Sequence, residues 1–283
     1  MKTLNSISGG KTSAYIAANY PADYDIFSLV RINEPNAKFK DEKTRQLIED
    51  KIQAPFIATA EDDVIIYTIL DLEQFIGRPI TWVTGPTFDE ITMRGNGNTY
   101  LPNKIQRFCT IKMKIEPIFE WWLNNVGEPI ETRIGFRANE TRRANNMLER
   151  CDENGLTSYK WSFEKTPDGR NKWEDVPYQK PRFPLIEDNI FKDKIELFWS
   201  DKPVRFAWMN NCVGCFHKSP LLLKKMWEKH PEKLNWFAKR ERESVNDATW
   251  RSDVTYDKIK EWRSQYELFE DDFSECDSGY CGL

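Results

Sequence analysis

A six-residue segment near the N-terminus constrains the fold of this chain more than any other feature of its sequence. Residues 8–13 read Ser-Gly-Gly-Lys-Thr-Ser, between a predicted strand over 3–7 and a predicted helix over 13–20. Glycine lets the backbone come close to an anion, and the free N–H groups at a helix start point toward it. Lys11 adds a positive charge to these donors. The arrangement predicts a phosphate-binding turn between a strand and a helix.

The same residues exclude a Walker A loop. That loop needs a glycine five residues before Gly10, and the sequence has Asn5 there. We therefore expect a different class of phosphate-binding loop, in which Ser8 and Ser13 supply hydroxyl donors.

The first half of the chain alternates short apolar runs with segments of helical periodicity, which predicts a parallel sheet. Further strands are predicted over 25–33, 55–60 and 131–136, and further helices over 41–52, 62–75 and 110–124. The expected fold class is α/β, with a Rossmann-like parallel sheet that carries helices on both faces.

Three other regions complete the expected organisation. Residues 84–103 are rich in glycine, proline and asparagine, which predicts a loop or mobile lid. The polar stretch 151–180 has a turn signal at Pro167-Asp168-Gly169, which predicts a surface hairpin insertion. Beyond Pro184 the chain is predicted to be mainly helical, and Ser219-Pro220 has the residue types that begin a helix.

Composition limits the class of protein. A net charge of −4 argues against a surface that binds nucleic acid throughout, but it leaves room for a local basic cleft. No stretch approaches the ~18–20 apolar residues that span a bilayer, and the N-terminus lacks the apolar segment of a signal peptide. We expect a cytoplasmic protein without membrane contact. In that reducing compartment its six cysteines are expected to serve metal, cluster or redox chemistry.

The glycine-containing loop resembles the Ser-Gly-Gly-x-x-Ser loop of the PP-loop ATP pyrophosphatases and the related phosphoadenylylsulfate (PAPS) reductases. Residues 107–117 (RFCTIKMKIEP) are similar to the Cys-x-x-x-x-Lys-x-x-Pro element of this family, and residues 135–143 (GFRANETRR) to its Gly-x-Arg-x-x-Glu-Ser-x-Arg element. The chain departs from the pattern at Thr12, where many relatives carry Asp, and at Phe108, where cluster-bearing members carry a second Cys. The resemblance covers roughly residues 3–219 and implies an adenine nucleotide alpha hydrolase-like fold.

Three cysteines are candidates for a metal centre. Cys212 and Cys215 form a Cys-Val-Gly-Cys turn, and Cys109 lies within a motif that resembles the family's. Soft thiolates suit iron–sulfur clusters or zinc. The resemblance implies a [4Fe–4S] cluster, with zinc and a metal-free thiol pair as alternatives. A three-cysteine cluster could leave one iron open for sulfide. Otherwise the candidates for a fourth ligand are Cys151, Cys276, Cys281 and, for zinc, His217, which we interpret first as a turn residue.

The resemblance supports two enzymatic functions and one without turnover. In the first, ATP is cleaved to AMP and pyrophosphate with the help of Mg²⁺, and the adenylate activates a small-molecule or nucleic-acid acceptor for sulfur transfer. In the second, the nucleotide is PAPS or adenylyl sulfate, and Cys276 attacks its sulfur to release sulfite. Glu275-Cys276 matches the start of the reductases' Glu-Cys-Gly-x-His element, but the Gly and His are missing. This departure favours the first function. A catalytically inactive nucleotide-binding module is the third hypothesis.

The predicted site residues form three groups. The catalytic group is Lys11, Arg137, Arg143 and Cys276. The nucleotide-binding group is Ser8, Gly9, Gly10, Lys11, Thr12, Ser13, Lys114, Arg137, Glu140 and Arg142. The metal-binding group is Cys109, Cys212, Cys215 and Cys281. Guanidinium groups at a strand-to-helix junction suit phosphate or sulfate oxygens, although Glu140 could instead pair with them at a solvated helix start.

The expected domains are residues 1–219, which bind the nucleotide, and residues 220–283, a helical region with a cysteine-containing tail. A basic run from Lys104 to Lys114 fits either a nucleic-acid acceptor or a solvated face. The oligomeric state is left open, with a homodimer among the alternatives.

Overall fold

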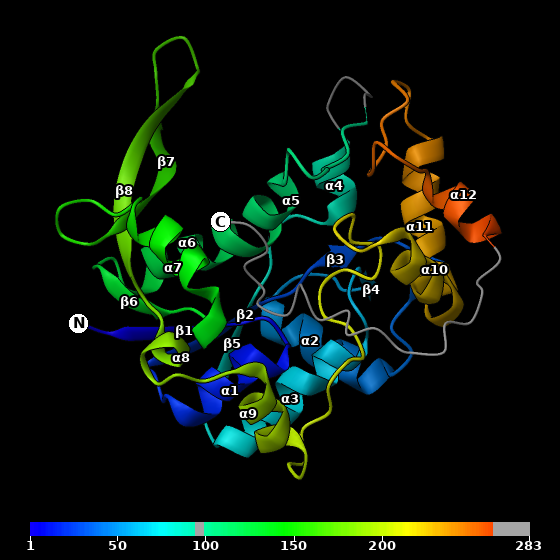
Figure 1. The fold of residues 1–283 in the computed structure, drawn as a ribbon. Coiled ribbons are helices and arrows are strands. Elements are labelled where there is room, and N and C mark those ends of the chain that lie inside the picture. The colour runs from blue at the N-terminus through cyan, green and yellow to red at the C-terminus, as the bar shows by residue number, and fades with distance from the viewer. Residues whose placement is uncertain (94–98, 263–283) are drawn as a thin grey trace.

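The main sheet is built around β1 (Thr3–Ile7), which lies between β2 (Tyr24–Ser28) and β6 (Ile130–Arg133). The computed structural model describes residues 1–93 and 99–262. Within them the sheet has six strands in the order β5-β2-β1-β6-β8-β7 (Figure 1). The outer strands are β5 (Ile80–Val83), β7 (Thr157–Lys165) and β8 (Asn171–Arg182). Neighbouring strands are parallel except for the antiparallel pair β7–β8. The expected α/β class with a mostly parallel, Rossmann-like sheet is confirmed.

The predicted strand over 25–33 is divided between two sheets. β2 ends at Ser28, and β3 (Arg31–Ile32) pairs antiparallel with β4 (Ala58–Thr59) in a separate small sheet. The prediction of a parallel strand over 55–60 was therefore too long and placed in the wrong sheet. The apolar run continues through the point where the backbone changes partner, so the pattern does not reveal it. Two backbone hydrogen bonds mark the change of partner: Leu29 N donates to Val83 O, and Ala60 N donates to Val30 O.

Helices cover both faces of the sheet, as predicted (Figure 1). On one face, α1, α2, α3 and α9 share a core with β1, β2 and β5. On the other face, Phe119 and Trp122 of α6 pack against Leu4 and Tyr178. These helices are α1 (Lys11–Asn19), α2 (Glu42–Ile52), α3 (Val64–Ile76), α6 (Glu116–Asn125) and α9 (Lys192–Trp199).

The region 84–103, predicted to be a loop or lid, contains a short helix in its described part. This is α4 (Phe88–Thr92), which Thr87 and Glu90 begin with a reciprocal capping box. The loop prediction was wrong here because the surrounding glycine and proline residues obscured that local signal. Residues 94–98 lie outside the described part of the chain.

The helix predicted over 110–124 begins earlier and is not a uniform α-helix. It consists of α5 (Phe108–Thr110), a π-helical turn η2 (Ile111–Ile115) and then α6. π-Helical turns are rare and often occur at functional sites. This one carries the lysine of the predicted Cys-x-x-x-x-Lys-x-x-Pro element.

The hairpin predicted within 151–180 is present, and Thr166 N donates to Arg170 O across its turn. It is more than a surface insertion, however. Residues 179–182 of β8 pair in parallel with 130–133 of β6, so the hairpin adds two strands to the main sheet. Its outer part projects from the end of the molecule opposite to α10–α12 (Figure 1).

The chain beyond Pro184 is mainly helical, as predicted. Ser219 Oγ accepts a hydrogen bond from Leu222 N at the start of α10, and Pro220 occupies its first turn. Besides α9, the helices of this region are α8 (Pro184–Glu187), α10 (Pro220–Lys229), α11 (Pro231–Arg242) and α12 (Tyr256–Glu261). The last three share a core with the small β3–β4 sheet. Among the described residues, no helix combines the length and apolarity needed to cross a bilayer.

Candidate functional site

The topology places two of the predicted motifs side by side. From β1 the chain first moves to β2 on one side, and it later returns to β6 on the other side. Loops at the carboxyl ends of strands on either side of such a switch form the usual ligand crevice of an open α/β sheet. The glycine-containing loop follows β1, and the 135–143 segment follows β6. They touch, because a Cβ on Gly135 would lie 3.3 Å from Thr12 Cγ2.

The loop after β1 has the backbone of an anion-binding turn. Gly9 has a φ of 77°, and a Cβ there would lie 2.5 Å from Ile65 Cγ2, so only glycine fits. α1 begins directly after Gly10, and no side chain caps it. Ser13 Oγ accepts from Ser8 N at 3.1 Å and donates to Gly10 O at 3.1 Å, which fixes the turn. The first N–H groups of α1 thus face the crevice without a side-chain cap.

Lys11 is placed differently from what its position in the loop suggests. Its Nζ forms an ion pair with Glu196 of α9, and its carbonyl accepts from Trp199 Nε1 at 2.9 Å. The Lys11 and Glu196 side chains are 34% and 38% exposed, so the pair is solvated and weak. A phosphate in the loop would compete with Glu196 for this charge.

The 135–143 segment forms a compact ion triad. The Glu140 carboxylate accepts from Arg137 Nε at 3.1 Å and also pairs with Arg143. Burial alone would raise the pKa of Glu140, but the Arg137 N–H and the Arg143 guanidinium lower it overall. The Arg143 guanidinium also lies 4.3 Å from the Phe136 ring centroid. Arg142 is exposed and lies outside the triad.

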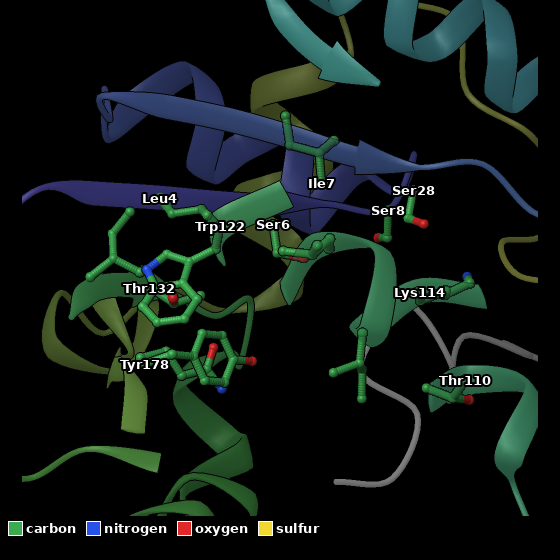
Figure 2. A pocket seen from close by; sticks show the side chains of 14 residues that line it. Leu4, Ser6, Ile7, Ser8, Ser28, Thr110, Lys114, Trp122, Thr132 and Tyr178 are labelled. Carbon is green, nitrogen blue, oxygen red and sulfur yellow. The ribbon is translucent and has the colours of Figure 1, made fainter. Parts of the chain in front are cut away.

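A cavity is lined by residues of this loop and of α6, and we call it the loop cavity (Figure 2). Ser8, Ser28 and Lys114 lie at its polar end, whereas Trp122 and Tyr178 lie at its aromatic end. Its lining is Leu4, Ser6, Ile7, Ser8, Ser28, Thr110, Lys114, Ile115, Ile118, Trp122, Ile130, Thr132, Tyr178 and Gln179. A cavity with hydrogen-bonding groups at one end and flat rings at the other suits a molecule with a polar and an aromatic part.

Three of the predicted metal ligands line a second cavity, which we call the cysteine cavity. They are Cys109, Cys212 and Cys215, and the cavity wall also includes Thr110 and Lys114. The two cavities therefore share Thr110 and Lys114 as a common border. Among the described residues, no three His, Cys, Asp or Glu side chains converge closely enough to hold a single metal ion.

Burial raises the pKa of two thiols of the cysteine cavity. Burial raises the pKa of Cys109 to about 12. Burial, and then the nearby Glu61 carboxylate, raise the pKa of Cys212 well above its usual value. Since metals bind the thiolate form, loading this site would release protons.

The turn that carries Cys212 and Cys215 is held by the C-terminal helical region. Gly214 packs against Phe237 of α11, and a Cβ on Gly214 would lie 2.4 Å from that ring. Tyr256 Oη donates to Gly214 O at 2.8 Å. The Arg251 guanidinium donates to the carbonyls of Phe216 and Lys218.

A buried ion pair lies at the border of the two cavities. Lys114 Nζ is 2.8 Å from Glu61 Oε1, and the Glu61 side chain is 1% exposed. Burial by itself lowers the pKa of Lys114, but the Glu61 carboxylate outweighs it and raises the pKa overall. Glu61 was not identified in the sequence analysis, although its position two residues after the end of β4 was a usable signal, because polar residues at strand ends often form sites.

The remaining cysteines lie elsewhere. Cys151 follows α7 (Thr141–Leu148), and its thiol donates to Met147 O at 3.6 Å, so it does not line the cysteine cavity. The predicted nucleophile Cys276 and the predicted ligand Cys281 lie outside the described residues.

These features define an α/β protein with a glycine-turn crevice at the switch point of its sheet and a thiol-lined cavity beside it. No protein-family model, curated protein or solved structure matches the chain. Its function therefore has to be inferred from these two cavities.

Proposed function

We propose that the chain is a PP-loop enzyme of the PAPS reductase family, with an adenine nucleotide alpha hydrolase-like fold. It binds ATP, cleaves it to AMP and pyrophosphate, and activates an acceptor for sulfur transfer. The observation that carries the proposal is the shared border of the two cavities, Thr110 and Lys114, which brings a phosphate-binding turn next to three thiols.

In this proposal the loop after β1 binds the departing pyrophosphate. The uncapped N–H groups of α1, the Ser8 hydroxyl and Lys11 donate to its oxygens. Arg137 and Arg143, held together by Glu140, neutralise charge on the α-phosphate from the neighbouring strand end. The adenine ring is expected at the aromatic end of the loop cavity. Mg²⁺, when bound to the nucleotide, would offset charge on the phosphates.

The proposed chemical step is an adenylation followed by a displacement. A carbonyl oxygen of the acceptor attacks the α-phosphorus, and pyrophosphate leaves. The acceptor is then adenylated at that oxygen, and a sulfur nucleophile displaces AMP from the acceptor carbon. The acceptor is a small molecule or a nucleic acid that presents such a carbonyl.

The donor set of the cysteine cavity fits a thiolate-bound centre. Cys109, Cys212 and Cys215 would hold an iron–sulfur cluster, which supplies sulfide or electrons when bound. The amines of the half-buried Lys114 and the buried Lys218 lie near these thiols and would offset the negative charge of three thiolates.

The test is a calorimetric titration of anaerobically purified protein with ATP plus Mg²⁺ and, separately, with PAPS. We expect tighter binding of ATP and formation of AMP and pyrophosphate once an acceptor is supplied. Preference for PAPS with sulfite release would instead identify a reductase, with Cys276 as its nucleophile. Tight ATP binding without turnover for any acceptor tried would favour an inactive module.

A matched pair of lysine variants tests the loop. Lys11→Ala should weaken ATP binding about tenfold, because a charge-assisted contact to phosphate is worth roughly 1–2 kcal/mol. Lys43→Ala, on the exposed face of α2, removes the same charge away from the crevice and should leave the affinity unchanged. Equal affinities for the two variants would remove Lys11 from the nucleotide site.

A further inference from the structure

The cysteine cavity is lined by an imidazole as well as by the three thiols. His217 lies two residues after Cys215, just before Ser219 begins α10, and it lines the same cavity. Its Nε2 atom is buried and has no hydrogen-bond partner among the described residues. Its ring lies against Phe216, with ring centroids 4.7 Å apart.

A buried ring nitrogen without a partner needs an explanation. Leaving such an atom unsatisfied costs about 1–3 kcal/mol, and exceptions of this kind often mark the place of an ion or water. Imidazole nitrogen is also among the commonest metal ligands in proteins. His217 thus offers an unused donor atom within the cavity that already holds three thiols.

The charges around His217 suit an anionic assembly. Lys104, Arg107, Lys218 and Arg251 all lie close enough to act electrostatically on its ring. A centre with three thiolates and bridging sulfides is negatively charged, and these side chains would stabilise it. The other alternative within the described residues, Cys151, lies at the end of α7 and does not reach the cavity.

We propose that His217 is the fourth ligand of the centre held by Cys109, Cys212 and Cys215, so that an iron–sulfur cluster here has three thiolate ligands and one imidazole ligand. This inference rests on the cysteine part of the proposed function and is independent of which nucleotide binds. It assigns no ligand role to Cys276 or Cys281. Imidazole in place of thiolate raises the reduction potential of an iron–sulfur centre.

The test uses the full chain, reconstituted anaerobically with iron and sulfide after labelling its histidines with ¹⁵N. Pulsed electron paramagnetic resonance of the reduced centre should show coupling to one histidine nitrogen. The chain has two histidines, so His230→Ala is the matched control. His230 Nε2 lies 3.3 Å from Asp62 Oδ2 and is not in the cavity wall. The coupling should survive His230→Ala and vanish in His217→Cys.

Iron content and potential give a second readout. His217→Cys should keep its iron and shift the potential to a more negative value, whereas Cys276→Ala and Cys281→Ala should change neither. A cluster without nitrogen coupling in the labelled wild type would overturn the inference, as would loss of iron in Cys281→Ala. If such a protein still binds and cleaves ATP, the proposed function stands without this ligand. Wild-type protein that takes up no iron contradicts both proposals.

Discussion

At the scale of single residues, Lys114 and Glu61 make the most consequential contact in the site. Removing the cation leaves the buried Glu61 carboxylate without its partner, which is far more costly than losing an exposed pair. We predict that Lys114→Met lowers the free energy of unfolding by about 3 kcal/mol. Chemical denaturation followed by tryptophan fluorescence measures this change.

The neighbouring Lys112 provides a control. It forms an (i, i+4) pair with Glu116, and its side chain is 45% exposed, so Lys112→Met should change the stability by less than about 1 kcal/mol. The double variant Lys114→Met/Glu61→Gln should regain much of the loss, because it removes the unpaired charge as well. Equal effects of the two single variants would show that the Lys114 pair is no stronger than a surface pair.

Residue-level prediction succeeded where a motif is local and failed where partners come from distant segments. The Ser8–Ser13 turn could be predicted because its glycines and hydroxyls lie within six residues. The partner of Lys11 could not, because Glu196 is separated from it by 185 positions and approaches only when α9 packs on α1. His217 was predicted to be a turn residue, and it does lie in a turn, but the burial of its Nε2 atom leaves no trace in a sequence.

At the scale of elements, the Cys212–Cys215 turn depends on close packing against α11. We predict that Gly214→Ala destabilises the protein by about 2 kcal/mol, because its Cβ would lie 2.4 Å from a ring that is itself buried among other aromatic side chains. Thermal and denaturant unfolding would measure the loss. Phe237→Leu makes room beside the turn, so the double variant should be more stable than the sum of the single effects predicts. If the stability changes of the two single variants simply add in the double variant, the Phe237 ring does not limit the space at Gly214.

Glu241 of α11 gives the helical region a pH dependence. Its carboxylate accepts from Trp250 N and Tyr256 N, and burial raises its pKa to about 7. Because the pKa is raised in the folded state, the protonated Glu241 side chain stabilises the fold. This contribution to the free energy of unfolding is complete below the pKa of the unfolded chain, near 4.5, and is lost as the pH rises through 7. When the pH rises from 5 to 8, the free energy of unfolding of the wild type should therefore fall by about 2 kcal/mol relative to that of Glu241→Gln.

Denaturant titrations at the two pH values measure this difference. Glu243→Gln, on an exposed neighbour in the same segment, should keep the wild-type dependence. A wild type and a Glu241→Gln variant that respond identically to pH would contradict the assignment.

Periodicity predicted most elements of the main sheet but not how they join. The strand over 3–7 and the hairpin within 151–180 were recognisable, because alternation and turn residues are local signals. The entry of β8 into the main sheet beside β6 could not be recognised. Paired residues such as Ile130 and Gln179 are 49 positions apart, and packing decides their pairing rather than the sequence of either segment. The split after Ser28 was hidden for the same reason.

At the scale of the whole molecule, the two predicted domains share a core. Val30 and Ile32 of the α/β part are buried together with Leu234 and Trp236 of α11. We predict that the full chain unfolds in a single calorimetric transition, with equal calorimetric and van't Hoff enthalpies. A fragment ending at residue 219 should fail to fold stably, because it exposes this core. Two separate transitions, or a fragment 1–219 with a cooperative transition of its own, would establish independent domains.

Thr110 and Lys114 belong to the walls of both cavities, so under the proposed function the occupancy of one cavity is linked to the state of the other. A ligand that draws Lys114 away from Glu61 changes the charge felt by the thiols, and this change carries a coupling free energy. By reciprocity, any change at the thiols alters the affinity for that ligand by the same factor. If the proposed function holds, the chemical state of the cysteines will change the binding constant measured at the glycine loop.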